Sequence, residues 1–163
     1  DVDLDGDVDL YVANDFGFDV LYRNNGDGTF AAVTEEVGIT FRNASMSADF
    51  GDVNGDGYPD VFASGMASNS RWIMTHAGFP LPAPFIINLL LPDEVIKVMW
   101  EMFHGNRLYL SQGDGTYREA GVETGTDYQQ WGWGSIFLDY DNDGLLDIYG
   151  TNGFWTGDRK EEA

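Results

Sequence analysis

The sequence is as informative in what it lacks as in what it contains. It has no cysteine, which excludes disulfide frameworks, thiolate zinc sites and cysteine nucleophiles. Basic residues are scarce: 8 Lys and Arg stand against 28 Asp and Glu, for a formal net charge of −20 at pH 7. Such a surface repels nucleic-acid phosphates and anionic lipids, so we expect no nucleic-acid partner. The longest apolar run, residues 85–91, is interrupted by Asn88 and is too short to insert across a membrane.

What is present indicates a folded domain that attracts cations. Hydrophobic residues make up 43% of the chain and aromatic residues 15%, enough to bury a core. The chain opens on Asp1, inside a repeated acidic motif. We therefore expect the sequence to be an excerpt from a longer chain, and we give the lack of a signal peptide little weight.

A repeat organises the chain. The nonapeptide DVDLDGDVD at 1–9 recurs as DVNGDGYPD at 52–60 and as DYDNDGLLD at 139–147. A second element, with Gly-Asp-Gly at its centre, occurs at 21–30 and at 108–117. The Gly-Asp-Gly aspartate precedes the next nonapeptide by 25 residues in both cases, which gives a repeat period of 51 residues and an insertion of 36 residues in the middle unit.

The segments around these motifs have the composition of strands. They are short and rich in Val, Ile, Tyr and Phe. Four short strands per unit at a period near fifty are typical of a propeller blade, so the predicted fold is all-β, a partial β-propeller of about two and a half four-stranded blades, with residues 1–163 forming part of a single domain. Because closed propellers have about 4–8 blades, this chain cannot close a ring alone. The predicted strands are 9–13, 20–23, 30–33, 46–50, 60–63, 107–110, 117–119, 133–138 and 147–149.

The insertion within the second blade, residues 66–104, differs from the rest. After Pro92, apolar residues recur at helical spacing, with acidic residues in the first turn and Gly105 as a stop. We expect one amphipathic helix that packs on the side or rim of its blade through a core stripe. The stripe comprises Val95, Val98, Met99, Met102 and Phe103.

The three nonapeptides have the chemistry of calcium loops. Ca²⁺ prefers six to eight oxygen ligands from a flexible loop. Side chains at positions 1, 3, 5 and 9 can converge, position 7 can offer its carbonyl, and the glycine at position 6 permits a sharp turn. Close carboxylates repel one another unless a cation neutralises them. The sequence therefore predicts three Ca²⁺ sites: Asp1, Asp3, Asp5, Asp7 and Asp9; Asp52, Asn54, Asp56, Tyr58 and Asp60; and Asp139, Asp141, Asp143, Leu145 and Asp147.

Alternatives to calcium loops fit less well. An EF-hand needs Glu at position 12 and flanking helices, whereas position 12 is Val12, Ala63 or Gly150. Mg²⁺ keeps several waters and rarely takes an all-protein cage, and solvated acidic turns do not explain three loops in register. The second loop, with Asn54 for Asp, carries one charge fewer and is expected to bind more weakly. For the Gly-Asp-Gly turns at Asp27 and Asp114, we predict a turn-forming role.

These motifs resemble known repeats. Phe50-Gly51 followed by the loop at 52–60 is similar to the FG-GAP (VCBS-type) repeat of integrin α-subunit propellers. Residues 106–109, 113–116, 131–134 and 139–144 resemble the ASPIC/UnbV group, bacterial relatives of cartilage acidic protein, which also carry a helical insertion at this place. The resemblance implies a seven-bladed extracellular propeller, with calcium ligands at motif positions 1, 3, 5, 7 (carbonyl) and 9.

The function predicted from the sequence is a calcium-binding module that uses a propeller face to bind a protein or glycan, as in cell adhesion. Further blades are expected from the same chain or from other subunits, and the location is extracellular, cell-surface or periplasmic, where calcium is plentiful. A structural subunit of a surface filament is an alternative, and part of a polysaccharide-acting enzyme is a second one. We expect no catalysis, because the only histidines, His76 and His104, lie in the insertion without a helical ligand spacing. Trp72 and Trp100 are candidates for partner contact, although core positions suit them better.

Overall fold

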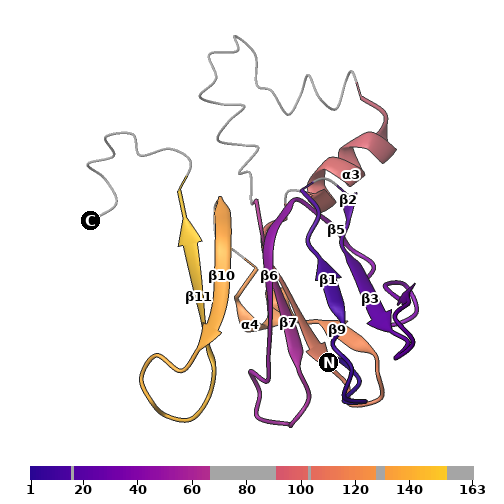
Figure 1. Ribbon diagram of the computed structural model, residues 1–163. Helices are drawn as coiled ribbons and strands as arrows, with labels where there is room; N and C mark the ends of the chain where they lie inside the picture. The colour runs from indigo at the N-terminus through magenta and orange to yellow at the C-terminus, as the bar shows by residue number, and fades with distance from the viewer. Residues whose placement is uncertain (16, 67–90, 103, 128–130, 154–163) are drawn as a thin grey trace.

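In the computed structural model, residues 1–15, 17–66, 91–102, 104–127 and 131–153 are described. Within them the chain forms antiparallel sheets that stand side by side (Figure 1). The four-stranded sheet is a complete blade, which we call blade 2. Its strands run in the order β6-β7-β8-β9 and span Ser45–Gly51, Asp60–Gly65, Arg107–Ser111 and Tyr117–Glu119.

Two partial blades flank it. Blade 1 has the order β1-β3-β4, and these strands correspond in the repeat to β7, β8 and β9. Blade 3 pairs two strands that correspond to β6 and β7. The described residues thus form part of an all-β propeller and no closed ring. The strands are β1 (Leu10–Val12), β3 (Val20–Asn24), β4 (Phe30–Ala32), β10 (Gly132–Leu138) and β11 (Asp147–Asn152).

Every predicted strand is present, within a few residues of its expected bounds. Two small features were not predicted. The first is a two-stranded ladder of β2 (Gly17–Phe18) with β5 (Arg42–Asn43), which is shorter than any pattern that alternation can reveal. The second is the one-turn helix α4 (Gly121–Thr124), which ends at Gly125 in the left-handed conformation.

The first strands of blades 2 and 3, β6 and β10, lie side by side without forming a ladder (Figure 1). Side chains of β6 satisfy backbone donors of β10 instead. The Ser135 N–H donates to the Ser47 hydroxyl at 2.9 Å, and the Phe137 N–H donates to the Asp49 carboxylate at 2.8 Å. Because an unpaired backbone donor is costly to bury, Ser47 and Asp49 allow two blades to splay apart with their polar groups bonded.

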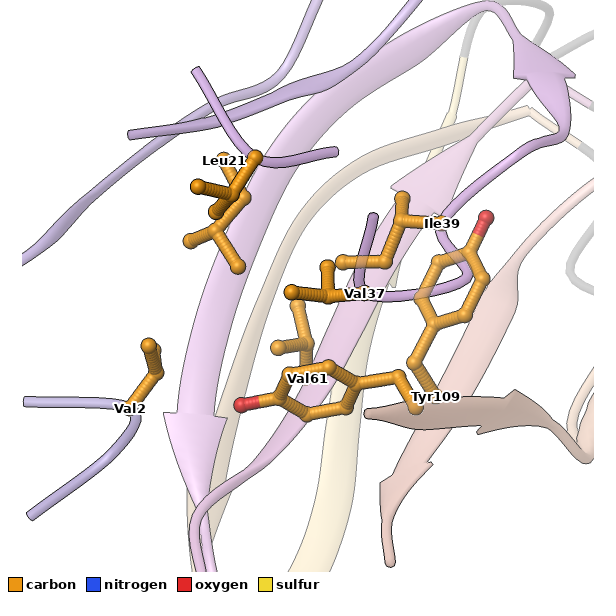
Figure 2. Packing of buried hydrophobic residues seen from close by; sticks show 8 residues of the cluster. Val2, Leu21, Val37, Ile39, Val61 and Tyr109 are labelled. Carbon is orange, nitrogen blue, oxygen red and sulfur yellow. The ribbon is translucent and has the colours of Figure 1, made fainter. Parts of the chain in front are cut away.

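The main hydrophobic core lies between blades 1 and 2. Figure 2 shows side chains of both blades meeting there, with Leu21 and Val2 on one side and Val61 and Tyr109 on the other. Each blade presents one apolar face that only a neighbouring blade can cover. The cluster consists of Val2, Leu21, Val33, Val37, Ile39, Val61, Tyr109 and Tyr117.

A backbone contact fastens the same two blades. The Tyr117 N–H of β9 donates to the Val37 carbonyl at 2.7 Å. Beside it, Gly38 has φ of +88°, and a Cβ there would stand 2.7 Å from the Tyr117 carbonyl oxygen. Only glycine fits this close approach.

The predicted helix is α3, Asp93–Met102, with Asp93 and Glu94 in its first turn as expected. The expectation that Val95 belongs to a core stripe is wrong, because that side chain is 42% exposed. The reason is that α3 contacts β5 and is fixed at its C-terminal end, where the Ala44 N–H donates to the Met102 carbonyl at 3.0 Å. The first turn is farther along the axis from that contact (Figure 1). Val98 and Met102 are half-buried, and the side chains of Met99, Trp100 and Phe103 lie outside the described residues.

In the described part of the chain, neither helix is long and apolar enough to cross a membrane.

Leu21 tests the core between blades 1 and 2. It is fully buried, so Leu21→Ala should lower the free energy of unfolding by about 2–5 kcal/mol, through lost apolar burial and the cavity left behind. The matched control is Leu10→Ala on the neighbouring strand β1, where the side chain is 51% exposed and the cost should stay within about 0.5 kcal/mol. Urea denaturation of both variants measures the difference, and equal costs would contradict this location of the core.

Candidate metal centres

The three acidic nonapeptides occupy equivalent places. Those at 52–60 and 139–147 connect the first two strands of blades 2 and 3, and the one at 1–9 leads into β1. All three lie at the same end of the sheets, opposite α3 (Figure 1). We call them loops 1, 2 and 3 in chain order. Their backbone and side-chain bonds follow one pattern, which can be described by motif position.

The carboxylate at position 1 holds the turn of its own loop. In every loop it accepts the N–H of the glycine at position 6. The donor–acceptor pairs are Gly6 to Asp1 at 3.1 Å, Gly57 to Asp52 at 2.8 Å and Gly144 to Asp139 at 3.0 Å. The turn is therefore formed around this carboxylate, which fixes its direction toward the middle of the loop.

The carboxylate at position 9 closes the loop and joins it to the blade. One oxygen accepts the N–H at position 2: Val2 to Asp9 at 2.7 Å, Val53 to Asp60 at 3.0 Å and Tyr140 to Asp147 at 2.9 Å. In blades 1 and 2 the other oxygen accepts an N–H at the end of the third strand, from Asn24 to Asp9 and from Ser111 to Asp60, both at 2.8 Å.

Burial of position 9 has an electrostatic consequence in loop 2. Asp60 is fully buried, and desolvation raises its pKa, opposed by the N–H bonds from Ser111 and Val53 and reinforced by Asp56 and Asp52 nearby. A carboxylate in this position favours a neutralising cation.

Two positions in each loop adopt the left-handed conformation. At position 6, where glycine was expected to permit a sharp turn, φ is +99° at Gly6, +91° at Gly57 and +90° at Gly144. At position 4 no such turn was expected, yet φ is +61° at Leu4, +75° at Gly55 and +61° at Asn142. The Gly and Asn at position 4 of loops 2 and 3 were the signal for this, since both residues tolerate that region. The two turns together fold the loop inward.

This folding brings carboxylates together in loops 1 and 3. Ligand oxygens of Asp1, Asp3 and Asp9 all lie within 4.8 Å of one another, and so do those of Asp139, Asp141 and Asp147. These are positions 1, 3 and 9 of the predicted ligand set. Among the described residues, loop 2 forms no such group of carboxylates. Its position 3 is Asn54, whose amide donates to Asp56 at 2.9 Å.

The carboxylate at position 5 makes a hydrogen bond within its own loop. It accepts the N–H of position 7, from Asp7 to Asp5 at 2.8 Å, from Tyr58 to Asp56 at 2.9 Å and from Leu145 to Asp143 at 2.8 Å. A carboxylate has a second oxygen and further lone pairs, so this bond leaves position 5 able to coordinate a cation as well. The three loops could therefore each hold a hard cation through oxygen ligands.

The side chain at position 7 packs against the Gly-Asp-Gly turn of the same blade. A Cβ on Gly26 would lie 2.8 Å from a carboxylate oxygen of Asp7, and one on Gly113 would lie 2.9 Å from the ring of Tyr58. Glycine at these turns is thus required both by positive φ and by the neighbouring acidic loop. Loop and turn form one corner in blades 1 and 2.

The Gly-Asp-Gly aspartates form their own turns, as predicted. Asp27 accepts the N–H of Thr29 at 2.9 Å and its hydroxyl at 2.6 Å. Asp114 does the same with Thr116, at 3.0 and 2.6 Å. Both hydrogen bonds lower the pKa of these two carboxyls, and the bond from the hydroxyl has the larger effect.

In the described part of the chain, His104 gives no such constellation. His104 lies 3.7 Å from Asp127, and the Asn106 N–H donates to the Asp127 carbonyl, so this contact fastens the end of the insertion to the segment after α4. His76 and Trp72 lie outside the described residues.

The two Gly-Asp-Gly turns provide a prediction with an internal control. A lowered carboxyl pKa stabilises the fold above the ordinary Asp pKa of about 3.9, and that contribution disappears as pH falls through the lower, folded-state value. Thr29→Val removes the hydroxyl donor and should raise the pKa of Asp27 in an NMR titration. Asp114 should titrate unchanged in the same molecule. If Asp27 kept its low pKa, the hydroxyl bond would not be the cause.

Comparison with protein families agrees with this geometry. A family model described as FG-GAP-like repeat matches residues 1–63 and 95–150. The matched residues include all three loops and both Gly-Asp-Gly turns. Comparison with curated proteins and with solved structures gives no match. The family model covers well over half of the chain, and the chain belongs to the FG-GAP-like repeat family.

Proposed function

We propose that the chain is a calcium-binding propeller module that acts in molecular recognition outside the cytoplasm, without catalysis. The observation that carries this proposal is the common frame of the three loops, with carboxylates gathered within 4.8 Å in loops 1 and 3. Three loops that repeat the same hydrogen bonds and the same left-handed positions indicate one shared purpose. FG-GAP-like repeats are blade elements of adhesion-type propellers, which supports the same reading.

Calcium suits these loops better than magnesium. The donors are carboxylates, an amide oxygen and main-chain carbonyls on an irregular loop, which matches the flexible coordination of Ca²⁺. Mg²⁺ demands a smaller octahedral shell and retains water. Extracellular calcium modules are commonly tuned to about 10⁻⁴–10⁻³ M, a concentration found outside the cytosol, and this supports an extracellular, cell-surface or periplasmic location.

Calcium would act as a stiffener of the blades. The carboxylate at position 9 bonds the start of its loop and the end of the third strand at once, so a cation held there joins distant parts of the blade. Without the cation, neighbouring carboxylates repel one another and favour an open loop. The module would therefore hold a defined binding face only in calcium.

The partner we propose is a protein or a glycan on a propeller face, with further blades supplied by the same chain or by other subunits. Tyr149 of β11 supports the expectation of further blades. It occupies the repeat position of Phe62, whose ring meets Phe137 of the next blade at 6.2 Å, yet Tyr149 is 57% exposed. This exposed face also keeps open the alternative of a structural subunit in a surface assembly. Within the family, the motifs at 106–109 and 131–134 favour the ASPIC/UnbV group.

The first test is native mass spectrometry in millimolar calcium, before and after chelation. We expect three bound Ca²⁺ ions per chain. A free calcium concentration of one hundred times Kd should add about 2.7 kcal/mol to the free energy of unfolding per site. Excess Mg²⁺ should not replace them.

A pair of variants with the same charge change controls this test. Asp139→Asn removes the carboxylate that holds the turn of loop 3 and should reduce the count to two ions at limiting calcium. Asp15→Asn, at an exposed carboxyl outside the loops, should keep three. A count unaffected by chelation, or equal losses in both variants, would show that the loops are ordinary acidic turns.

The residue at position 3 should set the order of affinities. Loop 2 has Asn54 where loops 1 and 3 have Asp3 and Asp141. Asn54→Asp should tighten the weakest site on the order of tenfold, about 1.4 kcal/mol, by adding one charge beside the cation. The reciprocal change Asp141→Asn should weaken loop 3 by a similar factor. Site-resolved calcium titration by NMR measures both, and equal affinities in the unaltered chain would contradict the charge argument.

A further inference from the structure

A buried carboxylate lies away from the acidic loops, at the junction of blades 1 and 2. Asp19 is almost fully buried just before β3. One of its oxygens accepts the hydroxyls of Tyr11 at 2.8 Å and Ser45 at 2.6 Å, and the other accepts the N–H of Asn14 at 2.9 Å. Tyr11 belongs to blade 1 and Ser45 begins the first strand of blade 2. Asp19 therefore joins the two blades through a single side chain.

Among the described residues, no group that faces Asp19 forms a direct ion pair with it. From β1 the neighbour is Tyr11, and from β8 the neighbours are Tyr109 and Arg107. Arg107 is buried too, but its guanidinium stacks on Phe41 at 4.5 Å and donates to the Glu101 carbonyl at the end of α3. Desolvation is the main influence on Asp19 and raises its pKa, while the three hydrogen bonds and Arg107 oppose that rise.

Blade 2 shows what this position requires when no charge is present. Asn106 occupies the same repeat position as Asp19 and is also buried. Its side-chain oxygen accepts the N–H of Gly65 at 3.2 Å, which matches the bond from Asn14 to Asp19, because Asn14 and Gly65 are equivalent in the repeat. Its amide donates to the Thr126 carbonyl at 3.1 Å. A neutral side chain thus serves the same bond in the neighbouring blade.

The two hydroxyl donors are particular to the junction of blades 1 and 2. The repeat positions of Tyr11 and Ser45 are taken by Phe62 and Gly132 in the next unit, and neither has a hydroxyl. Where the carboxylate is present, two extra donors are present as well. The pair of hydroxyls compensates part of the cost of burying a charge, since a buried charge needs hydrogen bonds.

We propose that Asp19 makes the joint between blades 1 and 2 responsive to protons, so that mild acidification neutralises the buried carboxyl and strengthens the joint. On protonation the desolvation cost of the charge disappears. The Ser45 hydroxyl can rotate so that its oxygen accepts the new O–H, which keeps the junction bonded. The device is separate from the calcium loops, because none of the three hydrogen-bond donors to Asp19 is a predicted ligand.

The direction of the pH effect follows from linkage. A carboxyl whose pKa is higher in the folded than in the unfolded chain binds its proton first in the folded state. Its contribution to stability therefore grows as pH falls through the folded value, until the unfolded chain also takes up its proton near pH 4. This is opposite in sign to the effect of Asp27 and Asp114.

The test compares thermal unfolding of the full chain between pH 7 and pH 4.5 in excess calcium. The variants are Asp19→Asn, which copies Asn106, and Asp15→Asn, an exposed carboxyl with the same charge change. The Tm of the unaltered chain should rise relative to Asp19→Asn by roughly 2–4 °C as pH falls, while Asp15→Asn follows the unaltered chain. Because all three proteins keep the same calcium loops, titration of the loops cancels in the differences.

An NMR titration of the carboxyl carbons gives an independent readout. The midpoint of Asp19 should lie above the ordinary Asp pKa of about 3.9. If Asp19 titrated at or below that ordinary value, or if the Asp19→Asn and unaltered curves stayed parallel at all pH values, the proposal would be wrong, whether or not calcium binds. Should Asp19→Asn not fold, the NMR midpoint in the unaltered chain decides the question.

Discussion

The structure depends on the hydrogen bonds of the aspartate at position 9 of each acidic loop. In blades 1 and 2 its two oxygens bond the second residue of the loop and the last residue of the third strand. Such a bridge ties the loop to the end of the strand that pairs with the one that follows the loop. It also delivers one member of each carboxylate group to its place, so the same residue serves the blade and the candidate cation site.

Blade packing adds a second constraint, because each sheet exposes an apolar face that a neighbour must cover. Blades 1 and 2 meet over Leu21, Val61 and Tyr109. Blades 2 and 3 meet through Phe62 and Phe137, while Ser47 and Asp49 satisfy backbone donors of β10. The polar bonds join β6 to β10, and the apolar contact joins β7 to the same strand β10. Twisted sheets can therefore pack side by side at an angle to one another and leave few backbone groups without a hydrogen bond.

The sequence predicted the repeated parts well and the unique parts poorly. Strands β1, β7 and β11 follow loops whose spacing recurs, so three copies supported each assignment. The β2–β5 ladder is too short to show a period, and Val95 fits a helical stripe although only the far end of α3 is docked. The left-handed position 4 was hidden because Leu4 occupies it in loop 1, whereas Gly55 and Asn142 reveal it elsewhere. Asp19 was missed because one isolated Asp in an acidic chain carries no pattern of its own.

Burial separates the acidic residues of this chain into kinds with different physical roles. Asp27 and Asp114 are exposed and bonded to neighbouring threonines, which favours their charged forms. Asp60 and Asp19 are buried, and desolvation acts against their charge. Asp60 stands among other carboxylates, so a bound cation would compensate its charge there. Asp19 stands among hydroxyls and a distant guanidinium, so a bound proton would compensate its charge instead. A net charge of −20 therefore does not act as a uniform field: its local effect depends on which compensating partner each carboxylate can reach.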